Sequence, residues 1–74
     1  MSYKDKYELE QLPERIEQLE SEIAGLHSEM ADPVFYKQSG EAIAAAQSAL
    51  QSLEQQLSDS YRRWEELEEF ASRQ

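Results

Sequence analysis

Apolar side chains recur at alternating intervals of three and four residues along most of this chain. The first series comprises Leu9, Leu12, Ile16, Leu19, Ile23, Leu26 and Met30. The second series comprises Ile43, Ala46, Leu50, Leu53, Leu57, Ser60, Trp64 and Leu67. This spacing is typical of helices that bury one narrow apolar stripe against another helix. The sequence therefore predicts two long helices whose stripes face each other.

The break between the two series lies at Asp32-Pro33. A residue before proline is pushed away from helical angles, so the first helix should end at about residue 31. We expect a tip loop over residues 32–39, in which Asp32 caps a single turn, and a second helix over about residues 40–71 with Ser39 as its cap. The predicted fold is all-α: residues 1–74 form one domain, an antiparallel two-helix coiled-coil hairpin. We expect a monomer, although a dimer of opened helices would satisfy the same heptads.

The first helix, over about residues 3–31, contains residues that are typical of helix starts and interruptions. Ser2 and Asp5 have the spacing of a capping box, in which both side chains bond to backbone amides of the first turn. Pro13 lacks an amide donor and crowds the carbonyl four residues before it. We therefore expect a short helix, a kink near residues 12–13, and a longer helix with Pro13 in its first turn. Gly25 is either a tolerated weak point or a site of close backbone approach.

An antiparallel register follows from the position of the loop. It places Met30 opposite Ile43 and Leu9 opposite Trp64, and it brings Glu8 near Arg63. Exposed ion pairs of this kind contribute little, so burial of the apolar seam has to supply most of the stability.

The charge balance is strongly acidic. Seven Lys and Arg residues stand against 16 Asp and Glu residues, which gives a net charge of −9. On electrostatics alone, this opposes wrapping of the domain around a phosphate backbone. The chain has no cysteine and no apolar run approaching the roughly 20 residues of a membrane span. We also find no signal peptide, and we expect a cytoplasmic protein.

The sequence offers no catalytic or metal-binding constellation. His27 is the single histidine, and no other residue completes a metal site at a suitable spacing. Acid–base catalysis needs carboxylates held in a cleft, which a two-helix hairpin does not provide. We expect a domain that is not an enzyme and holds no cofactor or metal.

Five of the seven cationic residues should gather at the base of the hairpin, where the chain begins and ends: Lys4, Lys6, Arg62, Arg63 and Arg73. Four aromatic residues lie among them: Tyr3, Tyr7, Tyr61 and Trp64. Cations interleaved with aromatics are a candidate nucleic-acid contact. The alternative is that neighbouring carboxylates consume these cations in local ion pairs.

Two bulky residues, Phe35 and Tyr36, lie in the predicted tip loop. They either plug the open end of the apolar seam or form an exposed contact at the tip. The sequence does not decide between these two roles.

Four successive motifs of this chain resemble those of the C-terminal domain of ABC-F type ATP-binding proteins of the Uup-like branch. The family's "SYK…ELE…LP" opening is matched by Ser2-Tyr3-Lys4, Glu8-Leu9-Glu10 and Leu12-Pro13, and its "IE.LE.EI..L" helix by residues 16–26. Its "M-A-D-P-x-F-Y" loop is matched by residues 30–36, and its closing "Y-x-R-W-E-E-L-E" by residues 61–68. The resemblance covers nearly the whole chain.

The resemblance implies the C-terminal domain of a larger bacterial protein with two ATP-binding cassettes, which would bind ATP and Mg elsewhere in the parent. It also implies a coiled coil associated with DNA binding. The expected function is therefore a non-catalytic contribution to binding DNA, or ribosomal or transfer RNA. The alternative is a protein-interaction or regulatory arm that docks on the parent ATPase or on a ribosomal partner.

Overall fold

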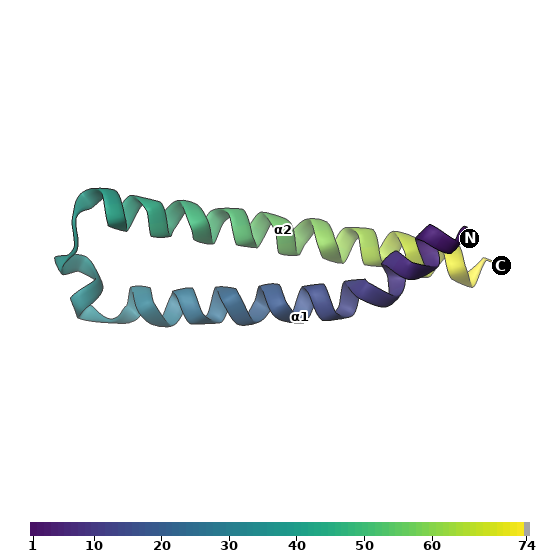
Figure 1. The fold of residues 1–74 in the computed structure, drawn as a ribbon, viewed down its shortest axis with the longest axis horizontal. Coiled ribbons are helices and arrows are strands. Elements are labelled where there is room, and N and C mark those ends of the chain that lie inside the picture. The colour runs from purple at the N-terminus through teal and green to yellow at the C-terminus, as the bar shows by residue number, and fades with distance from the viewer. Residues whose placement is uncertain (74) are drawn as a thin grey trace.

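The computed structural model describes residues 1–73 and contains two long antiparallel helices joined by one short turn. Helix α1 runs over Tyr3–Ala31, the 3-10 helix η1 over Pro33–Lys37, and helix α2 over Gly40–Ser72. The molecule is a rod with extents of 54 × 16 × 16 Å, and the beginning and end of the chain lie together at one end (Figure 1). The predicted hairpin is confirmed. We call the end with the termini the base and the end with η1 the tip.

The tip is built by two side-chain caps. The amide of Val34 donates to Oδ1 of Asp32 at 3.0 Å, which starts η1, and the amide of Ala42 donates to Oγ of Ser39 at 3.2 Å, which starts α2. Each cap satisfies an amide that has no partner within its own helix. The capping roles predicted for Asp32 and Ser39 are confirmed.

Helix α1 starts at a cap and continues through its proline. The amide of Asp5 donates to Oγ of Ser2 at 3.2 Å, so half of the predicted capping box is present. Pro13 lies inside α1, and the helix axis changes direction in its N-terminal part (Figure 1). The predicted kink is confirmed, but the expected restart of the helix at Pro13 is wrong. Leu12 and Ile16 are both buried, which indicates that packing on both sides of Pro13 maintains a single helix.

Burial is concentrated toward the base and directly beneath the tip turn. The buried apolar side chains are Leu12, Ile16, Leu19, Phe35 and Leu67. Leu19 is 1% exposed, the smallest exposure among these five side chains. The seam between Leu19 and the tip is only half-buried, as at Ile23 and Leu26. Two helices alone cannot enclose a seam on all sides, so the stability of the hairpin depends on a small number of residues.

Gly25 is a weak point in α1 and not a site of close approach. A Cβ atom built at this position meets no atom within 4 Å, and the backbone of Gly25 is not in the left-handed region. The backbone of this position therefore does not require glycine. Within residues 1–73, neither helix is long and apolar enough to cross a membrane.

Candidate nucleic-acid interface at the base

Arg63 is the centre of the polar contacts at the base. Its Nε donates to Oε2 of Glu8 at 2.7 Å and its Nη2 donates to Oε1 of Glu8 at 3.1 Å, which is a bidentate pair between the two helices. Nη2 also lies 3.5 Å from Oδ1 of Asp5, and Nη1 lies 3.5 Å from Oε2 of Glu66. One guanidinium group thus faces three carboxylates. The predicted proximity of Glu8 and Arg63 is confirmed.

The protonation equilibria reflect this pairing. The hydrogen bonds from Arg63 hold the pKa of Glu8 below its usual value of 4.5, against the opposing effect of partial burial. The same bonds raise the pKa of Arg63. A guanidinium that is already bonded bidentately has little capacity left for a phosphate. The geometry thus indicates that Arg63 joins the two helices.

Two further arginines, Arg62 in α2 and Arg73 at its C-cap, form exposed pairs with carboxylates of α2. Nη2 of Arg62 lies 2.9 Å from Oδ1 of Asp59, and Nη2 of Arg73 lies 2.6 Å from Oε1 of Glu69. All four side chains are largely exposed. Exposed pairs of this kind are weak and are screened by salt, so either arginine is able to exchange its carboxylate for another anion.

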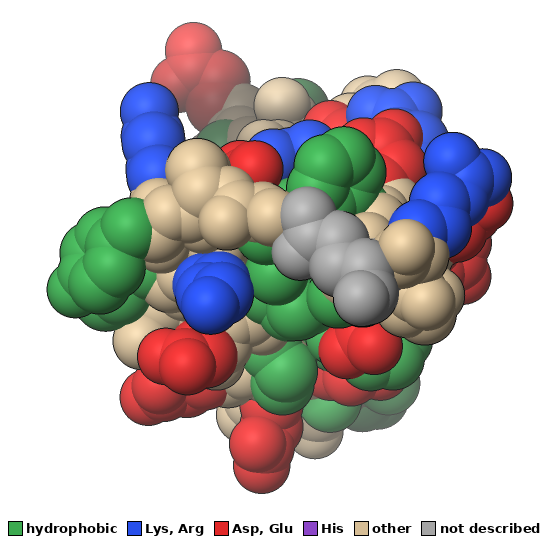
Figure 2. Space-filling model, turned by 90° about the vertical axis from the view of Figure 1, so that its right-hand side faces the viewer, with side chains coloured by type: hydrophobic (Ala, Val, Ile, Leu, Met, Phe, Trp, Pro, Cys, Tyr) green, Lys and Arg blue, Asp and Glu red, His purple; other side chains and the backbone are tan. Residues whose placement is uncertain are grey.

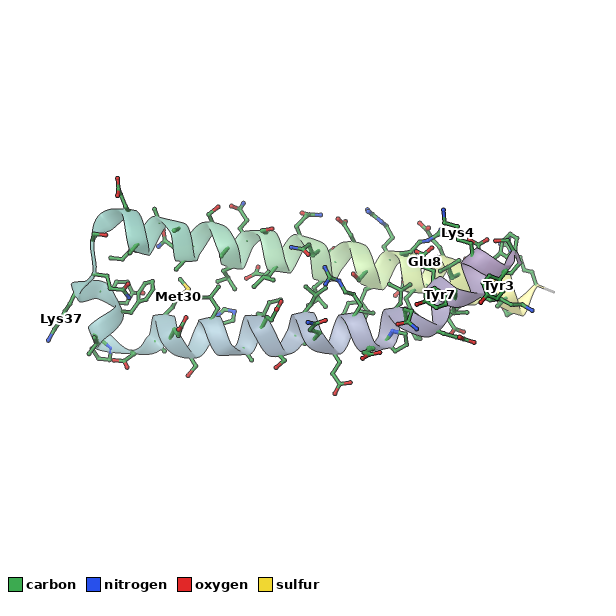
Figure 3. The ribbon with its side chains drawn as sticks, in the orientation of Figure 1. Tyr3, Lys4, Tyr7, Glu8, Met30 and Lys37 are labelled. Atoms are coloured by element: carbon green, nitrogen blue, oxygen red, sulfur yellow. The ribbon has the colours of Figure 1, made fainter. Side chains whose placement is uncertain are left out.

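Lys4 and Lys6 differ from the arginines in their surroundings. Both side chains are exposed, and neither has a carboxylate within ion-pair distance among residues 1–73. Asp5, which lies between them in the sequence, is directed at Arg63. Lys4 projects outward from the first turns of α1 (Figure 3). The two lysines are therefore available to an external anion.

Aromatic rings reach the surface beside these cations. Tyr3 is 84% exposed and Tyr7 is 56% exposed, whereas Trp64 is half-buried. Partial burial and the carboxylate of Glu20 raise the pKa of Tyr61. Viewed from the base, the surface shows cationic and apolar patches separated by carboxylates (Figure 2). Cations, aromatics and carboxylates are thus interspersed on this end.

The two aromatic residues at the tip differ in how far they are buried. Phe35 is 6% exposed, and its ring contacts Tyr36 edge-on with centroids 5.1 Å apart. Tyr36 itself is 61% exposed. Phe35 therefore acts as the plug of the seam, and Tyr36 is left as the exposed candidate for a tip contact. Lys37 projects away from the hairpin at the same end (Figure 3).

Comparison with known proteins places this hairpin in a family. Residues 1–69 match the family described as the ABC transporter C-terminal domain. The chain belongs to this family. The resemblance seen in the sequence motifs is thereby confirmed, and the coiled-coil hairpin is the structure of this chain's ABC transporter C-terminal domain.

Several relatives of this ABC transporter C-terminal domain carry related names. Two proteins of Haemophilus influenzae, ATP-binding protein Uup and ATP-binding protein Uup-like, are each 46% identical over 69 residues, which is 93% of this chain. ATP-binding protein Uup of Escherichia coli is 38% identical over 68 residues, or 92% of the chain. The chain spans only 11 to 15% of the length of these relatives.

A solved structure has the same fold as this ABC transporter C-terminal domain. It is described by the sentence "The C-terminal domain of the Uup protein is a DNA-binding coiled coil motif". It matches with a TM-score of 0.85 at 38% identity, and the match covers 92% of this chain and 80% of that one. The coiled-coil hairpin is therefore shared with a relative for which a binding activity is stated.

Some contacts of this ABC transporter C-terminal domain go beyond what the sequence predicts. Nη2 of Arg15 donates to Oε1 of Gln56 across the two helices at 2.7 Å. Arg15 is seven residues from Glu8, and Gln56 is seven residues from Arg63. Both pairs therefore belong to the same antiparallel register. The predicted antiparallel register places these two residues near each other, so this contact could have been found from the sequence. The bond between Asp5 and Arg63 could not have been found in this way, because the spacing of Asp5 from Ser2 indicates a capping box instead.

Proposed function

We propose that this chain is a non-catalytic DNA-binding arm of a larger, cytoplasmic ATP-binding protein that binds ATP and Mg in other domains. The observation that carries the proposal is the match, at a TM-score of 0.85 and 38% identity, to a domain described as a DNA-binding coiled coil motif. The names of the curated relatives, which are ATP-binding proteins, support the existence of the larger parent.

The charge distribution at the base supports this function despite the net charge of −9. Arg63 binds the carboxylates of Asp5 and Glu8, which are the acidic residues nearest to Lys4 and Lys6 in the sequence, and draws them toward α2. Lys4 and Lys6 have no such partner among residues 1–73, so their ammonium groups are the charges that a phosphate meets at the outward side of these turns. Salt screens charges that lie beyond the Debye length, which is about 10 Å at 0.1 M, so the carboxylates near the tip oppose this contact less than those at the base do.

The five cationic residues at the base therefore have different proposed roles. We assign Lys4 and Lys6 as primary phosphate contacts, because each is exposed and has no carboxylate partner in the described chain. Arg62 and Arg73 are secondary contacts, which would exchange a weak exposed pair for a phosphate. Arg63 is a positioning residue, because its bonds to Glu8 hold the first turns of α1 against α2.

Fluorescence anisotropy with labelled duplex DNA at low salt tests the proposal. The double variant K4Q/K6Q should bind more weakly than the unaltered chain, and the slope of log K against log salt should fall by about 0.9 for each phosphate that the variant no longer neutralises. K37Q is the matched control for K4Q and K6Q taken singly, because Lys37 is an exposed lysine at the opposite end of the 54 Å rod. The absence of any DNA binding at tens of micromolar chain, or an equal effect of K37Q, would contradict the proposal.

The same phosphate chemistry applies to RNA. The parent proteins of this family would then use the arm on ribosomal or transfer RNA. A labelled RNA hairpin in the same titration separates the two substrates, and we expect binding of DNA to be the tighter of the two because the structural relative is described as DNA-binding.

A second candidate function rests on the tip. Val34 and Tyr36 are both largely exposed on η1. Val34 also lines a hollow at the tip, together with Gln38 and Ala42. Exposed apolar side chains on a short rigid turn fit a protein contact, which would dock the arm on the ATP-binding cassettes of the parent or on a ribosomal partner. Calorimetric titration of the chain, with and without Y36A, into the cassettes measures this contact. Heat of binding that Y36A abolishes would support it, and no heat would exclude it.

A further inference from the structure

We propose that Tyr3 and Tyr7 form a stacking platform for unpaired bases, so that the base of the hairpin selects single-stranded DNA over a duplex. This inference rests on the proposed DNA-binding function and specifies its substrate class. It also gives a role to two exposed aromatic residues that the helix packing does not use.

The two tyrosines share one side of α1. They are separated by four residues on a helix, so their side chains lie one above the other. Glu8 and Leu12 lie on the opposite side of the same turns, where Glu8 bonds to Arg63 of α2 and Leu12 is buried. Tyr3 and Tyr7 therefore face away from α2, in agreement with their exposures of 84% and 56%. Figure 3 shows both rings at the base.

The lysines complete the platform. At 100° per residue, Lys4 and Lys6 lie on the two flanks of the ridge that Tyr3 and Tyr7 form. A strand with a base against each ring would carry its phosphates along these flanks, within reach of the two ammonium groups. Glu10 follows on the outward side of α1, and its charge ends the cationic patch after two turns. The platform thus fits a short stretch of strand, of about two bases.

Stacking on a side chain requires an accessible base face. The base faces of an intact duplex are covered by the neighbouring base pairs, whereas a single strand can present them. Phosphate contacts through lysine, by contrast, are made with both forms. Tyr3 and Tyr7 should therefore contribute to binding single strands only, and Lys4 and Lys6 should contribute to binding both.

The test compares three fluorescently labelled probes of equal length: oligo-thymidine, an abasic strand with the same sugar-phosphate backbone, and a duplex. Three variants are needed: Y3A/Y7A, Y3F/Y7F and K4Q/K6Q. We expect Y3A/Y7A to weaken binding of oligo-thymidine by about tenfold or more, given the usual contribution of stacking, and to leave the abasic and duplex probes within about twofold. Y3F/Y7F keeps the rings and should bind as the unaltered chain does. K4Q/K6Q should weaken binding of all three probes.

The outcomes distinguish failure of this inference from failure of the proposed function. If the unaltered chain binds none of the probes, both are wrong. If it binds the probes in a salt-dependent way but prefers the duplex, or holds oligo-thymidine and the abasic strand equally, only the stacking platform is wrong. The same conclusion follows if Y3A/Y7A weakens all three probes alike. Circular dichroism of Y3A/Y7A should show unchanged helix content, because both rings are exposed.

Discussion

Glu8, in the second turn of α1, and Arg63, in the last third of α2, are joined by two hydrogen bonds of 2.7 and 3.1 Å. This bidentate pair links residues that are 55 positions apart in the sequence. It lies between the two helices at the base, one turn beyond Lys4 on α1. The pair thus connects the packing of the hairpin with the presentation of its proposed contact surface.

The Glu8–Arg63 pair should make stability depend on pH in a defined direction. The pKa of Glu8 is lowered in the folded chain, so its stabilising effect is complete above the unfolded value of 4.5 and is lost as the pH falls through the lower folded pKa. In E8Q, this effect is absent at every pH. Urea unfolding of both proteins should therefore show a difference near pH 7 that shrinks toward about pH 3.

Comparison with E8Q is needed because the other carboxylates also titrate in this range. Neutralising them relieves repulsion in a chain of net charge −9, which raises the stability of both proteins. The difference between the two proteins removes this shared effect. A difference that stayed constant or grew on acidification would show that the pair does not contribute as described.

Replacement of Gly25 by alanine should stabilise the hairpin. A Cβ at this position meets no atom within 4 Å, and alanine is favoured over glycine inside a helix by roughly 0.5–1 kcal/mol. The matched control is G40A, at the first residue of α2, where the gain should be smaller because a helix end is less restricted. Thermal unfolding followed by circular dichroism measures both changes, and a lower midpoint for G25A would contradict the structure.

Leu19 should be among the residues most sensitive to truncation. It is 1% exposed, so L19A should lower the free energy of unfolding by about 2–5 kcal/mol. This is comparable with the whole stability of so small a domain, and L19A should be largely unfolded. L26A makes the same change at a half-buried position and should be tolerated better. Equal effects of L19A and L26A in urea unfolding would show that burial is not concentrated toward the base.

The two aromatic residues of η1 should behave differently when truncated. Phe35 is buried, so F35A should destabilise the hairpin, at or below the lower end of the roughly 3–5 kcal/mol seen in enclosed cores. Y36A should change stability little, because its ring is mostly exposed. Thermal midpoints of the two variants, measured side by side, check this. A larger loss for Y36A than for F35A would reverse the roles assigned to them.

The fold was accessible from the sequence because the features that determine it are local. The heptad spacing of Leu12, Ile16 and Leu19 predicts the seam, and Asp32-Pro33 predicts the reversal, without knowledge of distant contacts. The effect of Pro13 was harder to predict. A proline removes one hydrogen bond in any helix, but whether the helix stops or merely bends depends on packing against α2, which is a tertiary effect.

The candidate site was accessible only in part. Heptad positions bring the cationic residues to one end, but they do not determine which carboxylate each cation contacts. Asp5 could cap α1 or bond to Arg63, and only its side-chain conformation in the folded structure distinguishes the two. The division between Arg63 as a positioning residue and Lys4 and Lys6 as available contacts therefore required the structure.

Chemical-shift mapping tests the central claim, which is that the fold brings both ends of the chain together as the DNA-contacting surface. Amide spectra of the labelled chain would be recorded as a short single-stranded oligonucleotide is added. We predict shifts confined to the base, around residues 3–7 and 62–73, with residues 33–38 of the tip unchanged. Shifts centred on the tip, or spread evenly along both helices, would contradict the account.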